Sequence, residues 1–439
     1  MTITTPVLYC FRRSRRLLRT YGGGVGDFCQ TGTVATFHRL GGPDARAVEA
    51  RLEAYARERG IALVLPSLYK ELSAPALKQI VEELSEVRYL RQVVVSLGPA
   101  SAEDFRHALD YFSVLPQETR VIWNDGPSMT GIYGEMDARG LLTGTPGKGR
   151  SVWMAFGYIM SGPDVHAIAL HDCDIVGYER RLLMRLCYPV ASPSLDYDFC
   201  KGFYARVTDR MHGRVTRLLM TPLIGSLQKI LGRLPILAYL DSFRYVLSGE
   251  VAMDADLARI SRIPSDWGFE VGFLAEVYRN TSLRRICQVD IADAYEHKHQ
   301  DLSKDDPTKG LHKMAVDVCK SVLRMLKSEG IVLHDRFFNT LVAAYVQTAE
   351  DMLKRYEDDA AVNGLEFNRD EESLAVETFT RAIIEASDAV LGDPLGTPLI
   401  ESWDRVTSAM PGILRRIRAV VDADNGRGAI QGMRGDAAA

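Results

Sequence analysis

The stretch that decides the fold is HAIALHDCD, residues 166–174, where an apolar run ends abruptly in two acids one residue apart. A short apolar run with sharp borders is typical of a buried strand. Alternate residues of a strand point the same way, so Asp172 and Asp174 can face one spot if the extended geometry persists. The stretch therefore predicts a buried strand with two carboxylates at its carboxyl end. Two solvated loop aspartates remain the alternative.

Similar apolar runs precede this stretch, and helical patterns separate them. The runs are IALVLPSL (61–68), RQVVVSLG (91–98) and TRVIWNDGP (119–127). Residues 74–90 place their apolar side chains on one helical face, and residues 101–112 open with the capping-box pair Ser101 and Asp104. Strands that alternate with helices predict an α/β fold with a mostly parallel sheet and right-handed crossovers.

Length and composition indicate a folded protein with several regions. The chain has 439 residues, 46% hydrophobic and 25% charged, which is ordinary for a globular protein. The pattern becomes mixed after the strand at 166–174 and helical after Pro307. We expect an N-terminal segment (1–58), a first α/β half (59–176), a second half (177–305), a helical C-terminal region (306–422) and a disordered tail (423–439).

Charge and targeting signals exclude several classes of partner. A net charge of −4 argues against general nucleic-acid binding. No apolar run is long enough to span a bilayer, and the basic residues 12–19 are not followed by the apolar segment of a secretory signal. The seven cysteines are scattered and form no CxxC pair, which suggests a reducing compartment. We therefore expect a cytoplasmic enzyme without nucleic-acid or membrane partners.

The carboxyl ends of the predicted strands carry polar groups. Residues 66–71, 96–98, 124–126 and 172–174 would meet at one edge of a parallel sheet, where ligands of such folds bind. A D-x-D motif there offers hard oxygen ligands, which suit Mg²⁺ or Mn²⁺ together with phosphate oxygens. This edge is predicted to bind a nucleotide and a divalent metal.

Two basic motifs add candidates for the same site. GKGR (147–150) at a helix start can offer backbone N–H groups and Lys148 to a phosphate, although it lacks the spacing of a P-loop and also fits a flexible turn. In EHKHQ (296–300), His297 and His299 alternate after an apparent strand and can complete a metal shell. A hydrogen-bonded surface pair is the alternative for these histidines.

Two further motifs suit an anionic second substrate and its hydroxyl group. HGRVTRL (212–218) places Arg214 beside Gly213 and two residues before Thr216, and a guanidinium pairs well with phosphate or carboxylate. DWGFEVG (266–272) sets Glu270 among small and apolar residues, where a desolvated carboxylate can orient or deprotonate a hydroxyl. A solvent-facing glutamate at a helix start is the alternative for Glu270.

These pieces, in this order, resemble the glucosyl-3-phosphoglycerate synthases, retaining glycosyltransferases of the GT-A fold in the family numbered 81. The resemblance covers residues 61–300 and is closest to the longer, archaeal-type members. No single motif is specific for this family, but the occurrence of all seven in this order is. The motifs are VLPSL, GKG, HDCD, GRVTRLLMTPLI, LSGE, WGFEVG and QVDIADAYEHKHQ.

The resemblance implies a metal-dependent hexosyltransferase, a homodimer, that moves glucose from UDP-glucose to 3-phosphoglycerate. The product is the precursor of the compatible solute glucosylglycerate. The first α/β half would bind the nucleotide sugar and the second the acceptor. By position, the resemblance assigns the Mg²⁺ or Mn²⁺ ion to Asp174 and His297. It assigns contacts with the donor to Pro66, Leu68, Glu71, Ser96, Lys148, Asp172 and Asp174, and contacts with the acceptor to Gly213, Arg214, Thr216 and His299. Catalysis would involve Glu270, Lys148 and Asp174.

The sequence departs from the family pattern in two site positions. PSLYKEL follows the first strand where many members have an acid one residue earlier, so Glu71 replaces that acid approximately. His299 stands where some members carry asparagine. Three other functions remain open: a mannosyl-3-phosphoglycerate synthase using GDP-mannose, an inert nucleotide-sugar binder, and a sugar nucleotidyltransferase. The last is disfavoured because no Gly-rich basic loop follows the first strand.

Overall fold

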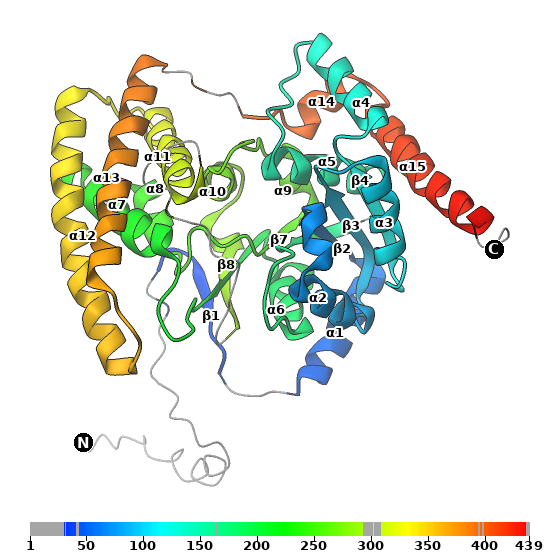
Figure 1. The fold of residues 1–439 in the computed structure, drawn as a ribbon, viewed down its shortest axis with the longest axis horizontal. Coiled ribbons are helices and arrows are strands. Elements are labelled where there is room, and N and C mark those ends of the chain that lie inside the picture. The colour runs from blue at the N-terminus through cyan, green and yellow to red at the C-terminus, as the bar shows by residue number, and fades with distance from the viewer. Residues whose placement is uncertain are drawn as a thin grey trace, which may run out of the picture. The chain divides into compact units, whose positions relative to one another are not determined.

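A central eight-stranded sheet organises the described chain (Figure 1). The computed structural model describes residues 30, 32–40, 44–162, 165–292, 302, 309–393, 396 and 399–435, with side chains as far as residue 426. The strand order is β1-β8-β6-β7-β5-β2-β3-β4. The strands are β1 (Ala35–Phe37), β2 (Gly60–Ser67), β3 (Leu90–Leu97), β4 (Glu118–Trp123), β5 (Val165–Leu170), β6 (Phe199–Tyr204), β7 (Val251–Asp254) and β8 (Ile286–Ala292).

The sheet is mostly parallel, as predicted, with one reversed strand. β7 is antiparallel to both of its neighbours, β5 and β6, and every other printed pairing is parallel. The strands β2 to β5 therefore direct their carboxyl ends to one edge. The apolar runs are continuous because helices cover both faces of such a sheet. Ile61 to Leu65 of β2, for example, are fully buried.

The helices before residue 192 follow the predicted alternation. They are α1 (Ala45–Glu58), α2 (Pro75–Ser85), α3 (Ala102–Phe112), α4 (Pro127–Ala138), α5 (Lys148–Met160) and α6 (Arg180–Ala191), with the short η2 (Tyr69–Ser73) after β2. The capping box predicted at Ser101 is present: the Ser101 hydroxyl accepts from the Asp104 N–H, and the Asp104 carboxylate accepts from the Ser101 N–H. The local signal at this helix start therefore agrees with the tertiary structure.

Shorter elements build the second half. They are the π-helical η3 (Val215–Met220), α7 (Thr221–Leu231), α8 (Pro235–Asp241), α9 (Ala255–Ile260), α10 (Phe269–Asn280) and η4 (Leu283–Arg285). Of these, η3 and the start of α10 carry the candidate acceptor and catalytic side chains.

The helical C-terminal region divides between the two halves. The helix α12 (Asp335–Asn363) packs against α7, and α11 (Gly310–Ser328) and α12 both pack against α13 (Arg369–Gly392) (Figure 1). The helix α15 (Ile413–Gly435) packs against α4, α5 and β4, and α14 (Trp403–Ala409) packs against α9. The rings of Trp403 and Trp153 stack with centroids 4.2 Å apart. The C-terminal region thus packs partly on α7 and partly on the edge strand β4.

The helix α15 extends past residue 423, where the sequence predicted a disordered tail. It continues to Gly435. Asn425 explains the ordering of its first part: the side chain accepts from the N–H of Val121 and donates to the C=O of Val121. Val121 lies on β4, the edge strand, so Asn425 satisfies backbone groups that an edge leaves unpaired.

The described residues from Gly32 onward form one compact unit, so the internal boundaries at 58, 176 and 305 stay predictions. Within the described chain, no helix has both the length and the apolar character needed to cross a membrane.

Candidate functional site

Three predicted side chains meet beyond the carboxyl end of β5. Lys148 begins α5, and its Nζ lies 2.7 Å from Oδ1 of Asp172 and 3.2 Å from Oε1 of Glu270. Asp172 follows β5, and Glu270 stands in the first turn of α10. The motifs GKGR, HDCD and WGFEVG therefore converge, and we call Lys148, Asp172 and Glu270 the lysine cluster.

Glycines allow the start of α5 to reach this position. A Cβ on Gly149 would lie 2.0 Å from the backbone oxygen of Pro264, and one on Gly147 would lie 2.8 Å from that of Ser265. Real Cβ atoms do not approach oxygen so closely, so any side chain there would push α5 away. The glycines of GKGR thus serve close packing, and the flexible-turn interpretation does not hold.

The ammonium of Lys148 stays charged in the lysine cluster. Burial disfavours the ammonium of Lys148, but the carboxylates of Asp172 and Glu270 outweigh burial and raise its pKa. Close by, burial raises the pKa of Glu71 to about 7, and Asp174 and Asp172 add to this rise. The Glu71 carboxylate also accepts a hydrogen bond from the Leu68 N–H at 2.9 Å. The carboxylates of Glu71, Asp172 and Asp174 therefore lie close enough at this edge to influence one another.

This group of carboxylates suits a divalent cation, although the described residues do not supply a complete set of metal ligands. Carboxylate oxygens are the ligands that Mg²⁺ and Mn²⁺ prefer. Among the described residues, no group of three His, Cys, Asp or Glu side chains could hold an ion. The predicted ligand His297, like His299 of the predicted acceptor set, lies outside the described residues.

The other predicted donor residues lie at or below the ends of β2 and β3. Leu68 follows β2 and is 39% exposed, so its side chain is available to a ligand. Pro66 pairs with Ser96 across the two strands. The Ser96 side chain is buried: it donates to the backbone oxygen of Ser151 on α5 and accepts from Asn124. Ser96 therefore fastens α5 to the sheet beneath the site.

Three residues that we did not predict support the lysine cluster. A Cβ on Gly249 would lie 2.9 Å from Oδ2 of Asp172 and 3.0 Å from Nζ of Lys148, so only glycine leaves room for this ion pair. Lys201, buried on β6, donates to the backbone oxygen of Ser248 at 2.7 Å and holds this loop. Burial lowers the pKa of Lys201 to about 8. A lysine inside the apolar run FCKGFY was the signal that could have found it.

Glu250, the third of these residues, connects the loop to the predicted acceptor residues. Its carboxylate accepts from the Tyr204 hydroxyl at 2.8 Å, and the ring of Tyr204 lies against that of Tyr245. Burial raises the pKa of the Tyr245 hydroxyl, and the nearby Thr216 side chain on η3 lowers it in part. A buried chain of polar and aromatic contacts therefore links the lysine cluster to η3.

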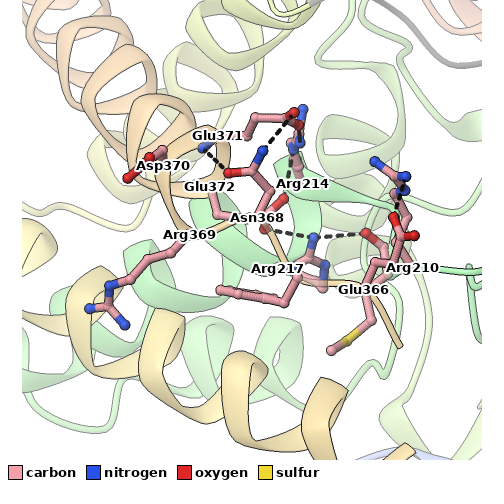
Figure 2. A pocket seen from close by; sticks show the side chains of 11 residues that line it. Arg210, Arg214, Arg217, Glu366, Asn368, Arg369, Asp370, Glu371 and Glu372 are labelled. Carbon is pink, nitrogen blue, oxygen red and sulfur yellow. Dashed lines mark hydrogen bonds and ion pairs between the residues drawn. The ribbon is translucent and has the colours of Figure 1, made fainter. Parts of the chain in front are cut away.

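Arg214 and Gly213 stand at the start of η3. Gly213 has φ +73°, a conformation that other residues rarely adopt. Arg214 lies beside a cavity of about 670 Å³ between η3 and the start of α13, and it points toward two carboxylates there (Figure 2). Its side chain pairs with Glu371 and Glu372, so the predicted anion-binding residue is held by the C-terminal helices.

Two curated proteins resemble the chain over nearly their whole length. A glucosyl-3-phosphoglycerate synthase of Persephonella marina is 46% identical over 91% of this chain and 99% of that protein. The chain belongs to the glucosyl-3-phosphoglycerate synthase family. A synthase of the same name from Methanococcoides burtonii is 39% identical over 87% of this chain and 94% of that protein. The family predicted from the ordered motifs is thereby confirmed, while no family model matches the chain.

Solved structures of a family member also align with the chain. Glucosyl-3-phosphoglycerate synthase from Mycobacterium tuberculosis, in complex with Mn²⁺, UDP and glucosyl-3-phosphoglycerate, is 20% identical, covers 66% of this chain and 87% of that one, and has a TM-score of 0.49. The same enzyme in complex with Mn²⁺, UDP-glucose and phosphoglyceric acid covers 67% of this chain and 88% of that one, at the same identity and TM-score.

The residues predicted for this member of the glucosyl-3-phosphoglycerate synthase family fall into two groups. Lys148, Asp172 and Glu270 are in direct contact, and Glu71 is close enough for Asp172 and Asp174 to raise its pKa. Gly213, Arg214 and Thr216 form a second group on η3. The structure thus provides two centres in a synthase-family fold, one built on Lys148 and one on Arg214, each with carboxylate partners.

Proposed function

We propose that this protein transfers glucose from UDP-glucose to 3-phosphoglycerate and forms glucosyl-3-phosphoglycerate. The observation that carries the proposal is the similarity to the glucosyl-3-phosphoglycerate synthase of Persephonella marina. The two sequences are 46% identical, and the match covers 99% of that protein. The lysine cluster at the carboxyl edge of the sheet supports it, because nucleotides bind at this edge in open α/β folds.

Lys148 is the residue that we assign to the departing nucleoside diphosphate. Its ammonium is charged and is held by Asp172 and Glu270 before any substrate binds. A fixed positive charge stabilises the negative charge that develops on a leaving diphosphate. Asp172 would position Lys148 against the donor, whereas Asp174 would hold the metal, so the two aspartates have unequal roles.

A divalent metal, when bound, neutralises the leaving diphosphate. We propose that Asp174 and His297 hold it. The gathered carboxylates of Glu71, Asp172 and Asp174 support a cation at this edge, since burial and mutual repulsion raise the pKa of Glu71.

Gly213, Arg214 and Thr216, with His299, are the residues that we assign to the acceptor. The guanidinium of Arg214 pairs with phosphate or carboxylate groups in a planar, two-point geometry. The contacts from Thr216 through Tyr245 and Tyr204 to Glu250 support a fixed spacing between this acceptor residue and the lysine cluster. Fixed spacing aligns the acceptor hydroxyl with the donor.

We assign Glu270 to a hydroxyl group of the transferred sugar. Its side chain is 10% exposed and contacts Lys148, so it lies where the sugar and diphosphate would join. We propose that the reaction retains the configuration at the anomeric carbon. Analysis of the product anomer by NMR tests this, and an inverted product would refute it.

An assay with purified protein tests the function directly. With UDP-glucose, Mg²⁺ and 3-phosphoglycerate, we expect UDP release that depends on 3-phosphoglycerate. Preferential turnover of GDP-mannose would assign a mannosyl transferase instead. In a parallel assay with UTP and glucose 1-phosphate, release of pyrophosphate would indicate a nucleotidyltransferase. No turnover in either assay would indicate a binding protein.

The family assignment also leads us to propose a homodimer in the cytoplasm and a role in making a compatible solute. Light scattering during size-exclusion chromatography tests the first point, with a mass of twice that of one chain expected.

A further inference from the structure

The cavity between η3 and α13 holds Arg214 between two carboxylates of the C-terminal helices. NH2 of Arg214 lies 2.7 Å from Oε2 of Glu371, and Nε lies 2.8 Å from Oε1 of Glu372. Figure 2 shows both carboxylates directed at this guanidinium, while the guanidinium of Arg369 points away from it. The two partners differ in burial and in their other contacts.

Glu372 is a fixed part of the structure. Its side chain is only 6% exposed, and its second oxygen lies 2.9 Å from NH2 of Arg217. Arg217 donates in turn to the backbone oxygens of His212 and Met211 and lies over the ring of Tyr356. A buried carboxylate shared by two arginines is strongly held, because its removal leaves buried charges unpaired.

Glu371 is the open partner. Its side chain is 49% exposed. It stands in the first turn of α13, where the Asn368 side chain caps the helix and donates to Oε1 of Glu371 at 3.0 Å. An ion pair exposed to water contributes little to stability. Replacement of the Glu371 carboxylate by another anion at Arg214 therefore costs little free energy. Carboxylates and phosphates compete for the same guanidinium donors.

We propose that Glu371 sets the affinity for the acceptor by occupying Arg214 until the phosphate of an anionic acceptor displaces it. Glu372 keeps the guanidinium oriented during this exchange, so the C-terminal helices form part of the acceptor site. The inference rests on the proposed function, since it takes Arg214 as an acceptor residue. An acceptor with a doubly charged phosphate competes well with Glu371, whereas glycerate, with one carboxylate, competes poorly.

The experiment compares Glu371→Gln with the unaltered chain and with Glu357→Gln. Glu357 is a matched control: it also pairs with an arginine at 2.7 Å in the same helices, but that partner is Arg369. For Glu371→Gln, we expect the KM for 3-phosphoglycerate to fall about two- to five-fold, while the KM for UDP-glucose stays unchanged. Turnover of glycerate should gain no more than that of 3-phosphoglycerate, because release of Arg214 helps most the acceptor that pairs with it through a phosphate. Glu357→Gln should change neither quantity.

The outcomes separate this inference from the proposed function. If the unaltered chain releases no UDP with 3-phosphoglycerate, the proposed function fails, and calorimetric titration with 3-phosphoglycerate still shows whether Glu371→Gln binds it more tightly than Glu357→Gln does. If the unaltered chain turns over but Glu371→Gln shows an equal or higher KM for the acceptor, the inference is overturned. A fall in KM that Glu357→Gln reproduces would also overturn it.

Discussion

The lysine cluster and the arginine pair Arg214–Arg217 both place a cation between two carboxylates, but different parts of the fold assemble them. Lys148, Asp172 and Glu270 stand at the ends of elements that the central sheet fixes, and glycines let them approach. Glu372, by contrast, reaches Arg214 from 158 residues away in sequence, on a helix outside the sheet. The first centre is set by the sheet, and the second depends on the docking of α13.

Because of this difference, we expect the lysine cluster to matter mainly for catalysis and the arginine pair mainly for stability. The lysine cluster holds a partly exposed charge at a ligand-binding edge, so its loss should affect turnover more than folding. The arginine pair includes a carboxylate that is almost fully buried, so loss of that carboxylate should affect folding directly.

Lys148→Met should have the largest effect on activity. Removal of a preorganised charge that faces the leaving group lowers kcat by about 100- to 1,000-fold. Initial rates of UDP release measure this, with thermal unfolding as the control for folding. Lys148→Arg keeps the charge but not the compact ammonium, and should recover only part of the rate. A kcat within about threefold of the unaltered value for Lys148→Met would remove Lys148 from the catalytic site.

Glu372→Gln should destabilise the fold most among changes at the arginine pair. It leaves Arg214 and the buried Arg217 without their shared carboxylate, which should lower the free energy of unfolding by about 3 kcal/mol. Glu371→Gln, at the exposed partner, should lower it by less than about 1 kcal/mol. Urea unfolding of both variants measures the contrast, and equal losses would contradict the distinction between a fixed and an open partner.

The contrast between a centre set by the sheet and a centre set by docked helices also determines how much could be predicted from the sequence. Apolar runs and the capping box at Ser101 are local, so the strands β2 to β5 and the helix α3 were predicted close to their observed bounds. Parallel strands bring their carboxyl ends together, so the approach of Asp172 to Glu71 followed from topology. Lys148 was expected to contact a phosphate at a helix start, and its ion pair with Asp172 was not predicted. The contact between Glu270 and Lys148 had only the family resemblance behind it.

Contacts between distant segments carried no local signal. The pairing of Arg214 with α13 joins residues that no pattern relates. The reversed strand β7 is only 4 residues long and lies within a mixed region, so the sequence did not reveal it. The ordering of α15 at Asn425 depends on the unpaired edge of β4, which exists only in the folded sheet.

Lys201→Met tests whether the buried lysine that supports the lysine cluster has a lowered pKa in the folded protein. Its folded pKa of about 8 lies below the ordinary 10.5, so the folded state binds fewer protons than the unfolded state between these values. The charged form therefore costs stability below pH 8, and that cost disappears as pH rises to 10.5. The stability of the unaltered chain relative to Lys201→Met should increase by about 3 kcal/mol across this window. Urea unfolding at pH 7.5, 9 and 10.5 measures this, and a difference independent of pH would show that Lys201 has an ordinary pKa.

Gly149→Ala should have a moderate effect on stability and turnover, and it tests whether close packing sets the lysine cluster. The added methyl group would lie 2.0 Å from the Pro264 oxygen, so the start of α5 must move. We expect a loss of about 1 to 2 kcal/mol in the free energy of unfolding and a fall in kcat of about tenfold, because Lys148 shifts with the helix.

Gly134→Ala is the matched control: Gly134 lies inside α4 with nothing within 4 Å of its added Cβ. There, alanine should stabilise the helix by about 0.5 to 1 kcal/mol and leave kcat unchanged. If Gly149→Ala behaved like Gly134→Ala, the approach of α5 to Pro264 would not determine the position of Lys148, and the contrast between a centre set by the sheet and one set by docked helices would lose its structural basis.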